Sequence, residues 1–139
     1  MKGYVALIVA CVAAALAALA VNWHPSSLLS LRVVMVTAPN VQTAKELGHS
    51  LVASKLAACV NIVPKITSIY MWNGAIQEDK EVQLIIKTHQ TLFSRVVDHV
   101  LKAHPYDTPE VIALPVAGAA MPYKQWWESS LVIRDVGDR

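Results

Sequence analysis

The order of hydrophobic and polar positions divides the chain into an apolar N-terminal segment and a patterned remainder. No charged side chain occurs between Lys2 and Arg32, and residues 3–21 carry no polar side chain other than the Tyr4 hydroxyl. As a helix, this segment would be about 28 Å long, close to the hydrocarbon thickness of a bilayer. A positive residue, an apolar stretch and small residues at 18–20 describe a signal peptide equally well.

The composition of this segment favours a signal peptide over a membrane anchor or an organellar presequence. Eight of the residues 3–21 are alanine, which is only marginally favourable in lipid, so we expect a cleaved signal first and a weak membrane anchor second. Both predict a secreted or membrane-associated protein of the secretory pathway. An organellar presequence is disfavoured, because the segment has neither Arg nor Ser. We therefore divide the chain into a leader at 1–24, a linker at 25–31 that opens with Pro25, and a folded domain at 32–135.

Strand-like and helix-like periods alternate within the folded domain. Alternating and β-branched runs indicate strands, and apolar residues three or four apart indicate helices. The pattern predicts, in order, strand 32–37, helix 41–58, strand 59–70, a return strand ending at 82–86, helix 92–101, strand 110–116, a short helix from Pro122 and, as an option, a last strand at 131–133. Asn40 is expected to cap the first helix, Pro64 to bend its strand, and Asn73-Gly74 to form a hairpin turn.

The order β-α-β-β-α-β predicts an α+β fold of the ferredoxin-like, split β-α-β type, with both helices on one face of an antiparallel sheet. The strands on either side of Asn73-Gly74 are unusually long for so small a domain. A long hairpin exposes unpaired backbone groups, which proteins normally blunt or pair with another chain. We therefore expect an oligomer that is closed by symmetry.

Composition and charge narrow the class of protein. Of the 139 residues, 55% are hydrophobic and only 16% are charged, which excludes a mainly disordered chain. The formal net charge of +2, without a basic run, excludes nucleic-acid binding as the main role. The two cysteines, Cys11 and Cys59, are too few for a disulfide framework or a four-cysteine zinc site.

The sequence contains no pattern typical of catalysis. G-x-S-x-G, H-E-x-x-H and phosphate-cradling loops do not occur, so we do not expect an enzyme. Glu78, Asp79 and Glu81 cluster near the hairpin, but Lys80 lies among them, which is typical of a solvated face. Cys59 follows a helix and opens an apolar strand, so we expect its thiol to be buried.

Several segments resemble the CutA family in order and spacing, over about residues 32–131. They are 37–40, 55–61 (KLAACVN), 66–70, 72–74, 86–88, 104–111 (HPYDTPEV) and 114–116. The resemblance implies a homotrimer of ferredoxin-like subunits in which the long hairpin strands pair between subunits. It also implies a role in tolerance of divalent cations, copper above all. Animal members, which this chain resembles in having a leader, are linked to the membrane anchoring of acetylcholinesterase.

For copper binding, the resemblance implies contacts at only two residues of this chain. His104 matches a histidine before the Pro-Tyr of the family's copper site, and Cys59 matches the cysteine of the KLAACVN segment. The chain departs from that pattern where Val36 replaces a first-strand cysteine and Ala103 replaces a second histidine. Copper or another divalent cation is therefore expected at His104 and Cys59. His89, at a strand-to-helix junction, is expected to act as a cap.

Six polar and aromatic side chains lie at or near the predicted strand ends. They are Tyr70, Trp72, Lys87, Tyr106, Glu110 and Trp126. Groups on a rigid scaffold often line a cleft, which predicts a small-ligand or metal cleft between subunits. In this prediction Lys87 and His104 donate hydrogen bonds and Glu110 accepts them. The alternative is that the aromatic side chains only pack at a subunit interface.

Three functions are therefore compatible with the sequence. The first is a CutA-like homotrimer linked to copper tolerance or binding, without catalysis. The second is a trimeric scaffold for membrane-associated partner proteins, of the acetylcholinesterase anchoring type. The third is a PII-like small-ligand sensor, which rests on fold analogy alone.

Overall fold

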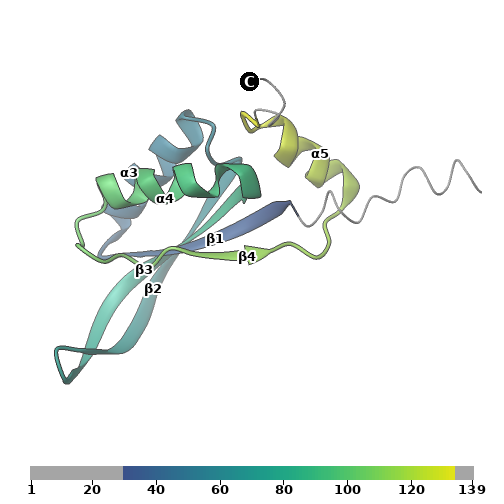
Figure 1. Ribbon diagram of the computed structural model, residues 1–139. Helices are drawn as coiled ribbons and strands as arrows, with labels where there is room; N and C mark the ends of the chain where they lie inside the picture. Colours follow the sequence, from purple (N-terminus) through teal and green to yellow (C-terminus); the bar gives the residue numbers. More distant parts are fainter. Residues whose placement is uncertain (1–29, 134–139) are drawn as a thin grey trace, which may run out of the picture.

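The computed structural model describes residues 30–133 (Figure 1). Its elements are β1 (Leu31–Ala38), α3 (Val41–Ala53), β2 (Cys59–Trp72), β3 (Ala75–His89), the 3-10 helix η1 (Gln90–Leu92), α4 (Phe93–Ala103), β4 (Ile112–Pro115) and α5 (Met121–Ser129). The predicted leader at 1–24 and most of the predicted linker lie outside the described residues. Within residues 30–133, no helix has both the length and the apolar character needed to span a membrane.

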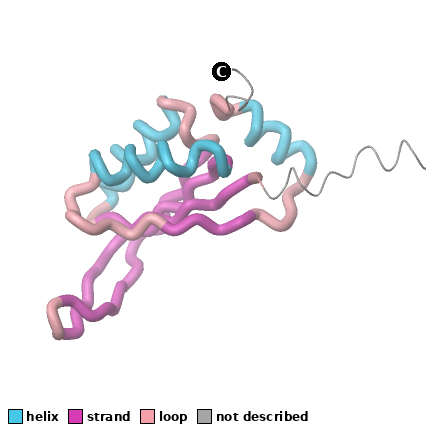
Figure 2. The backbone as a smooth tube through the Cα atoms, in the orientation of Figure 1, coloured by secondary structure: helices cyan, strands magenta, loops and turns pink. Residues whose placement is uncertain are grey.

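The four strands form one antiparallel sheet in the order β2-β3-β1-β4. Helices α3 and α4 lie side by side over one face of this sheet (Figures 1 and 2). The element order and this layering confirm the predicted ferredoxin-like α+β fold. Two strands that neighbour each other in the sheet, β1 and β3, are far apart in the sequence, because α3 and β2 intervene.

Strand alternation produces the core between the sheet and the two helices. Val34 pairs with Ile86 and Val36 pairs with Leu84, and all four side chains are fully buried. From the helix layer, Val96 and Val100 of α4 are buried in the same cluster, one helical turn apart. Burying each such side chain contributes roughly 1.5–3 kcal/mol, so this layer holds the helices on the sheet.

Helix α3 begins as predicted but ends early. The side chain of Asn40 accepts a hydrogen bond from the Thr43 amide at 2.9 Å, which confirms the cap. The helix ends at Ala53 instead of the predicted 58, because Lys55 takes a φ of 55°, in the left-handed region. The amide of Leu56 then donates a hydrogen bond to the carbonyl of Leu51, in the last turn of the helix. The sequence did not reveal this end, since residues 54–58 contain no glycine or proline.

Strands β2 and β3 form a hairpin of 14 and 15 residues, which projects beyond the helix layer (Figure 2). A register shift between Val63 and Ile66 confirms the bend expected at Pro64. Asn73 and Gly74 take φ values of 49° and 80°, as a tight turn with two left-handed residues requires. The hairpin turn was therefore correctly predicted from two adjacent residues.

The C-terminal part differs from the prediction in two details. Strand β4 is shorter than the predicted 110–116, and residues 131–133 form no strand. Helix α5 starts with Pro122 in its first turn as expected. After it, the backbone of residues 131–133 makes one bond to a distant segment of the described chain, from the Val132 amide to the Lys55 carbonyl. One such bond does not make a ladder, so this segment packs without joining the sheet.

The sheet face opposite α3 and α4 carries a row of apolar side chains, which we call the open face. Strand alternation and register place on it Val33, Met35, Cys59, Ile85, Ile112 and Leu114, with the polar Asn61 and Lys87 among them on β2 and β3. Ile112 and Leu114 are 49% and 46% exposed. An apolar sheet face of this kind is normally covered, either within the chain or by another copy.

Candidate functional site

A cleft of about 670 Å³ lies at the base of the long hairpin, where the loop that follows α4 meets β1. Its lining combines acidic, aromatic and hydroxyl side chains, and we call it the acidic cleft. The lining residues are Thr37, Ser68, Tyr70, Trp72, Asp79, Glu81, Pro105, Tyr106, Asp107, Thr108 and Glu110. Four of the six predicted cleft residues are therefore brought together here, namely Tyr70, Trp72, Tyr106 and Glu110.

The hairpin strands supply one wall of the acidic cleft. The Tyr70 hydroxyl donates a hydrogen bond of 2.5 Å to Asp79, across the β2–β3 pair. This bond to an anionic acceptor, followed by burial and the charges of Asp79 and Glu81, raises the pKa of Tyr70 to about 12. Tyr70 therefore stays neutral at physiological pH, and its hydroxyl proton remains in the hydrogen bond to Asp79.

Glu81 occupies the most buried position in the acidic cleft. It is 6% exposed, and no ion pair within residues 30–133 involves it. Its neighbour is the hydroxyl of Tyr106, whose pKa is raised first by burial and then by the charge of Glu81. A buried carboxylate without a cation is costly unless a compensating charge or hydrogen bonds stabilise it.

Charge in the acidic cleft has one sign. Asp79, Glu81, Asp107 and Glu110 contribute four carboxyl groups, and within residues 30–133 no Lys, Arg or His side chain lines the cleft. Four carboxylates around one space create a field that attracts cations and repels anions. The expected donor Lys87 is not among the residues that line this cleft within one chain.

His104 lies behind the acidic cleft instead of lining it. Its Nδ1 atom accepts a hydrogen bond from the Tyr106 amide at 3.1 Å, so its Nε2 atom carries the proton and donates to the Thr37 carbonyl at 2.9 Å. The ring is 8% exposed and packs edge-on against Tyr106. Both nitrogens have partners, so His104 positions the cleft loop and offers no free nitrogen to copper.

Cys59 lies at the other end of the sheet, paired with Lys87. The thiol is half-buried rather than buried, and the Asn61 side chain donates to its sulfur at 3.7 Å. Burial lowers the pKa of Lys87, and the neighbouring Cys59 opposes this shift. Burial and the nearby Cys59 also raise the pKa of Tyr123 on α5.

The two expected copper ligands are therefore separated within one chain. Cys59 aligns with Val33 of β1 through Lys87, whereas His104 bonds to Thr37, four residues further along β1. At about 3.3 Å per residue, this separates them by about 13 Å along the strand. Among the described residues, no three His, Cys, Asp or Glu side chains are close enough to hold a metal ion. A single chain thus does not fit the copper site that the sequence suggested.

Trp126 also lies outside the acidic cleft. It is on α5, 45% exposed, with its ring 5.2 Å from the ring of Tyr123. Trp126 thus lies on a helix and not at a strand end, and within one chain it does not share the acidic cleft. The predicted cap at His89 is confirmed, since its Nδ1 atom accepts a bond from the Thr91 amide at 3.2 Å.

The acidic side of the site differs from what the sequence predicts. The charged run at 78–81 predicts a solvated face, because Lys80 stands between Asp79 and Glu81. Strand alternation instead puts Asp79 and Glu81 on one side of β3, and Glu78 with Lys80 on the other, where they form an ion pair at 3.5 Å. The signal was therefore present as a two-residue period within the charged run.

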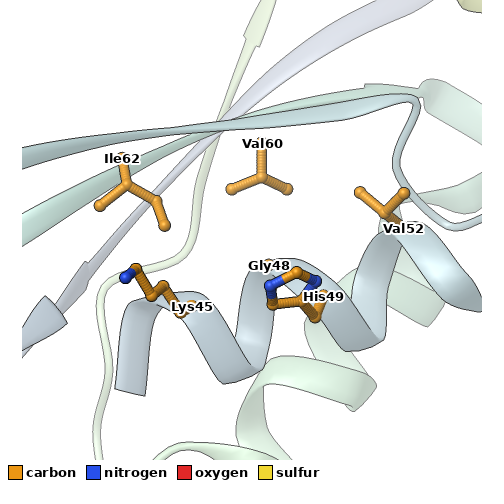
Figure 3. A pocket seen from close by; sticks show the side chains of 6 residues that line it. All are labelled: Lys45, Gly48, His49, Val52, Val60 and Ile62. Atoms are coloured by element: carbon orange, nitrogen blue, oxygen red, sulfur yellow. The ribbon is translucent and has the colours of Figure 1, made fainter. Parts of the chain in front are cut away.

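A second, smaller pocket of about 280 Å³ lies between α3 and the edge strand β2 (Figure 3). Gly48 forms its floor, and a Cβ atom there would lie 3.4 Å from Val60. Lys45 and His49 line it from the same helix, and both are exposed. The pocket brings together no set of groups that suggests a reaction or a specific ligand.

Comparison with known proteins gives a consistent result. Residues 32–130 match the family model described as CutA1 divalent ion tolerance protein. The chain is 52% identical over 98 residues to the chloroplastic protein CutA of Arabidopsis thaliana, covering 70% of this chain and 54% of that protein. It is 50% identical over 97 residues to the human protein CutA, again covering 54% of that protein. The chain thus spans about half the length of these relatives.

A bacterial relative and a solved structure match over most of their own length. The divalent-cation tolerance protein CutA of Thermus thermophilus is 44% identical over 94 residues, which cover 68% of this chain and 91% of that protein. The crystal structure of CutA1 from Oryza sativa superposes with a TM-score of 0.73 at 47% identity, covering 76% of this chain and 96% of that structure. The similarity therefore extends over the sheet, the helices and the hairpin.

Proposed function

The chain belongs to the CutA1 family of divalent ion tolerance proteins, and on that premise we propose that it acts as a non-catalytic homotrimer in divalent-cation tolerance. The matched family and the Thermus thermophilus relative are named for divalent-cation tolerance and not for a reaction. The observation that carries the proposal is the open face, an apolar sheet surface that neither α3 nor α4 covers. When copies of the chain associate through this face, each copy buries the apolar side chains of its neighbour.

The sheet edges support the same assembly. Strands β2 and β4 are the two outer strands of the sheet. When one edge of a copy pairs with the other edge of the next, the contact is heterologous and closes into a ring if the rotation allows it. The long β2–β3 hairpin extends beyond its own helix layer, so it reaches a neighbouring copy in such a ring (Figure 1).

We further propose that copper is the cation of this role and that Cys59 is its contact. A thiol is a preferred ligand of Cu(I), whereas both nitrogens of His104 already have partners. Cys59 lies on the open face, so assembly through that face supplies it from more than one subunit. Copper binding is therefore expected to need the oligomer.

The test combines sedimentation velocity with a Cu(I) competition titration of the full chain. We expect a trimer that binds Cu(I), a Cys59→Ser variant that remains trimeric but loses Cu(I), and a Cys11→Ser control that keeps it. A monomer at micromolar concentration would refute the assembly. Equal Cu(I) affinity in both serine variants would refute Cys59 as the contact and leave the assembly standing.

The leader defines a separate part of the proposal. We propose that residues 1–24 direct the protein into the secretory pathway, as a cleaved signal or as an anchor. The test is to express the full chain in animal cells, fractionate the cells, and determine the N-terminus of the mature protein by mass spectrometry. Cleavage near residue 24 supports a signal, an intact terminus in the membrane fraction supports an anchor, and retention in an organelle or the cytosol contradicts both.

The scaffold remains the second function, because an assembled trimer at a membrane could hold a partner such as acetylcholinesterase without binding copper. Co-purification with that enzyme in the absence of Cu(I) binding would favour it over metal chemistry. The PII-like sensor is less favoured, because the four carboxyl groups of the acidic cleft repel nucleotide phosphates.

A further inference from the structure

We propose that the acidic cleft binds a small organic cation, a molecule that carries a primary ammonium or guanidinium group. This inference goes beyond divalent-cation tolerance and does not depend on copper contact at Cys59. It rests on the proposed assembly leaving the cleft open, because Thr37 and Glu81 lie on the side of the sheet that carries the open face. It rests on three features of the cleft, which are a buried carboxylate without a cation, aromatic walls and a volume suited to a small molecule.

The buried carboxylate is Glu81. It lines the cleft at 6% exposure, and the two ion pairs within residues 30–133 belong to Lys80 with Glu78 and Lys124 with Glu128. The Tyr106 hydroxyl is its neighbour, and this one hydroxyl does not neutralise a charge. A cation placed in the cleft would pair with Glu81 at a buried position, where a charge-assisted hydrogen bond is stronger than in bulk water.

The aromatic walls favour an organic cation over a bare metal ion. Tyr70, Trp72 and Tyr106 line the cleft together with the carboxyl groups. The faces of aromatic rings attract ammonium and guanidinium groups, and alkyl carbon packs against them favourably. A divalent ion instead requires several oxygen ligands at one point, and the described residues contain no such cluster.

The volume and the hydroxyl groups agree with this choice. At about 670 Å³, the cleft lies within the range of about 300–1,000 Å³ that is typical of small-molecule sites. The hydroxyl oxygens of Ser68 and Thr108 provide neutral acceptors beside the carboxylates. An ammonium group has several N–H donors to satisfy, so this mixture of acceptors suits it.

Isothermal titration of the full chain with putrescine tests the proposal. The uncharged isostere 1,4-butanediol and magnesium chloride at equal ionic strength are the matched ligands. We expect saturable binding of putrescine, none of butanediol, and no displacement of putrescine by magnesium beyond the effect of ionic strength. Equal binding of putrescine and butanediol, or displacement of putrescine by low magnesium, would overturn the organic-cation assignment.

Variants then test whether the putrescine binding measured for the wild type takes place in the acidic cleft. Glu81→Gln removes the buried charge, and Glu78→Gln is its control, because Glu78 lies on the same strand but projects to the other side. We expect about tenfold weaker putrescine binding for Glu81→Gln and no change for Glu78→Gln. Asp79→Asn, on the more exposed hairpin, should also weaken binding and serves if Glu81→Gln does not fold. Unchanged affinity in both cleft variants would refute the site.

Discussion

The Nε2 atom of His104 lies 2.9 Å from the carbonyl oxygen of Thr37, which joins the loop after α4 to the end of β1 across 67 positions of sequence. The same ring accepts from the Tyr106 amide through Nδ1, so one side chain fixes the loop at two points. Tyr106 and its neighbours line the acidic cleft. His104 is therefore the residue that positions this wall of the cleft.

Replacing His104 with alanine should lower stability without changing copper affinity. The substitution leaves the Tyr106 amide and the Thr37 carbonyl without their partners, at a cost of roughly 1–3 kcal/mol. Urea denaturation measures the loss, with His49→Ala on the exposed side of α3 as the control. A parallel Cu(I) competition titration that showed a large loss of affinity in His104→Ala would contradict the positioning role and restore His104 as a ligand.

Tyr70 should ionise far above the usual range of a tyrosine. Its hydrogen bond to Asp79 raises its pKa to about 12, so the folded state keeps the proton longer than the unfolded state does. Stability from this group is present below about pH 10 and is lost as the pH rises toward 12. Ultraviolet difference titration of wild type against Tyr70→Phe reports its pKa. Asp79→Asn should move that pKa down, and an unshifted value in the wild type would exclude the bond.

His89 should make stability depend on pH in the acid range. Burial, together with the nearby Arg32 and against the opposing effect of Glu128, lowers its pKa. The folded state then binds fewer protons, so stability is present above about pH 6.5 and is lost as the pH falls below it. Protonation also removes the Nδ1 acceptor of the Thr91 amide. His89→Asn keeps a cap without titrating, so its unfolding free energy should fall less between pH 8 and pH 5 than that of the wild type.

Gly74→Ala should destabilise the hairpin turn. Gly74 has a φ of 80°, and no atom lies within 4 Å of the position that an alanine Cβ would occupy, so the cost is backbone strain of about 1 kcal/mol and not a clash. Gly118 is the matched control, because its Cβ position is also open and its φ is not left-handed. Thermal unfolding of both variants separates the effects. A loss of the same size in Gly118→Ala would contradict the role of the turn conformation.

Local signals in the sequence were sufficient for most of the fold. Asn40 caps α3, Pro122 lies in the first turn of α5, and Asn73-Gly74 turns the hairpin, all as predicted. These features depend on the backbone preferences of one or two neighbouring residues. The end of α3 was missed because Lys55 adopts a left-handed conformation that lysine does not signal.

The candidate site was only half predictable for a related reason. The element order and the hairpin follow from the amino-acid sequence alone, as does the presence of Tyr70, Trp72, Tyr106 and Glu110 near strand ends. Tertiary structure alone decided that these four meet Glu81 in one cleft, while Lys87 and Trp126 lie elsewhere. Strand alternation is local and sets which residues share a side, but the cover on each side comes from distant segments. The loop after α4 buries Glu81, and only the packed fold brings that loop to the hairpin.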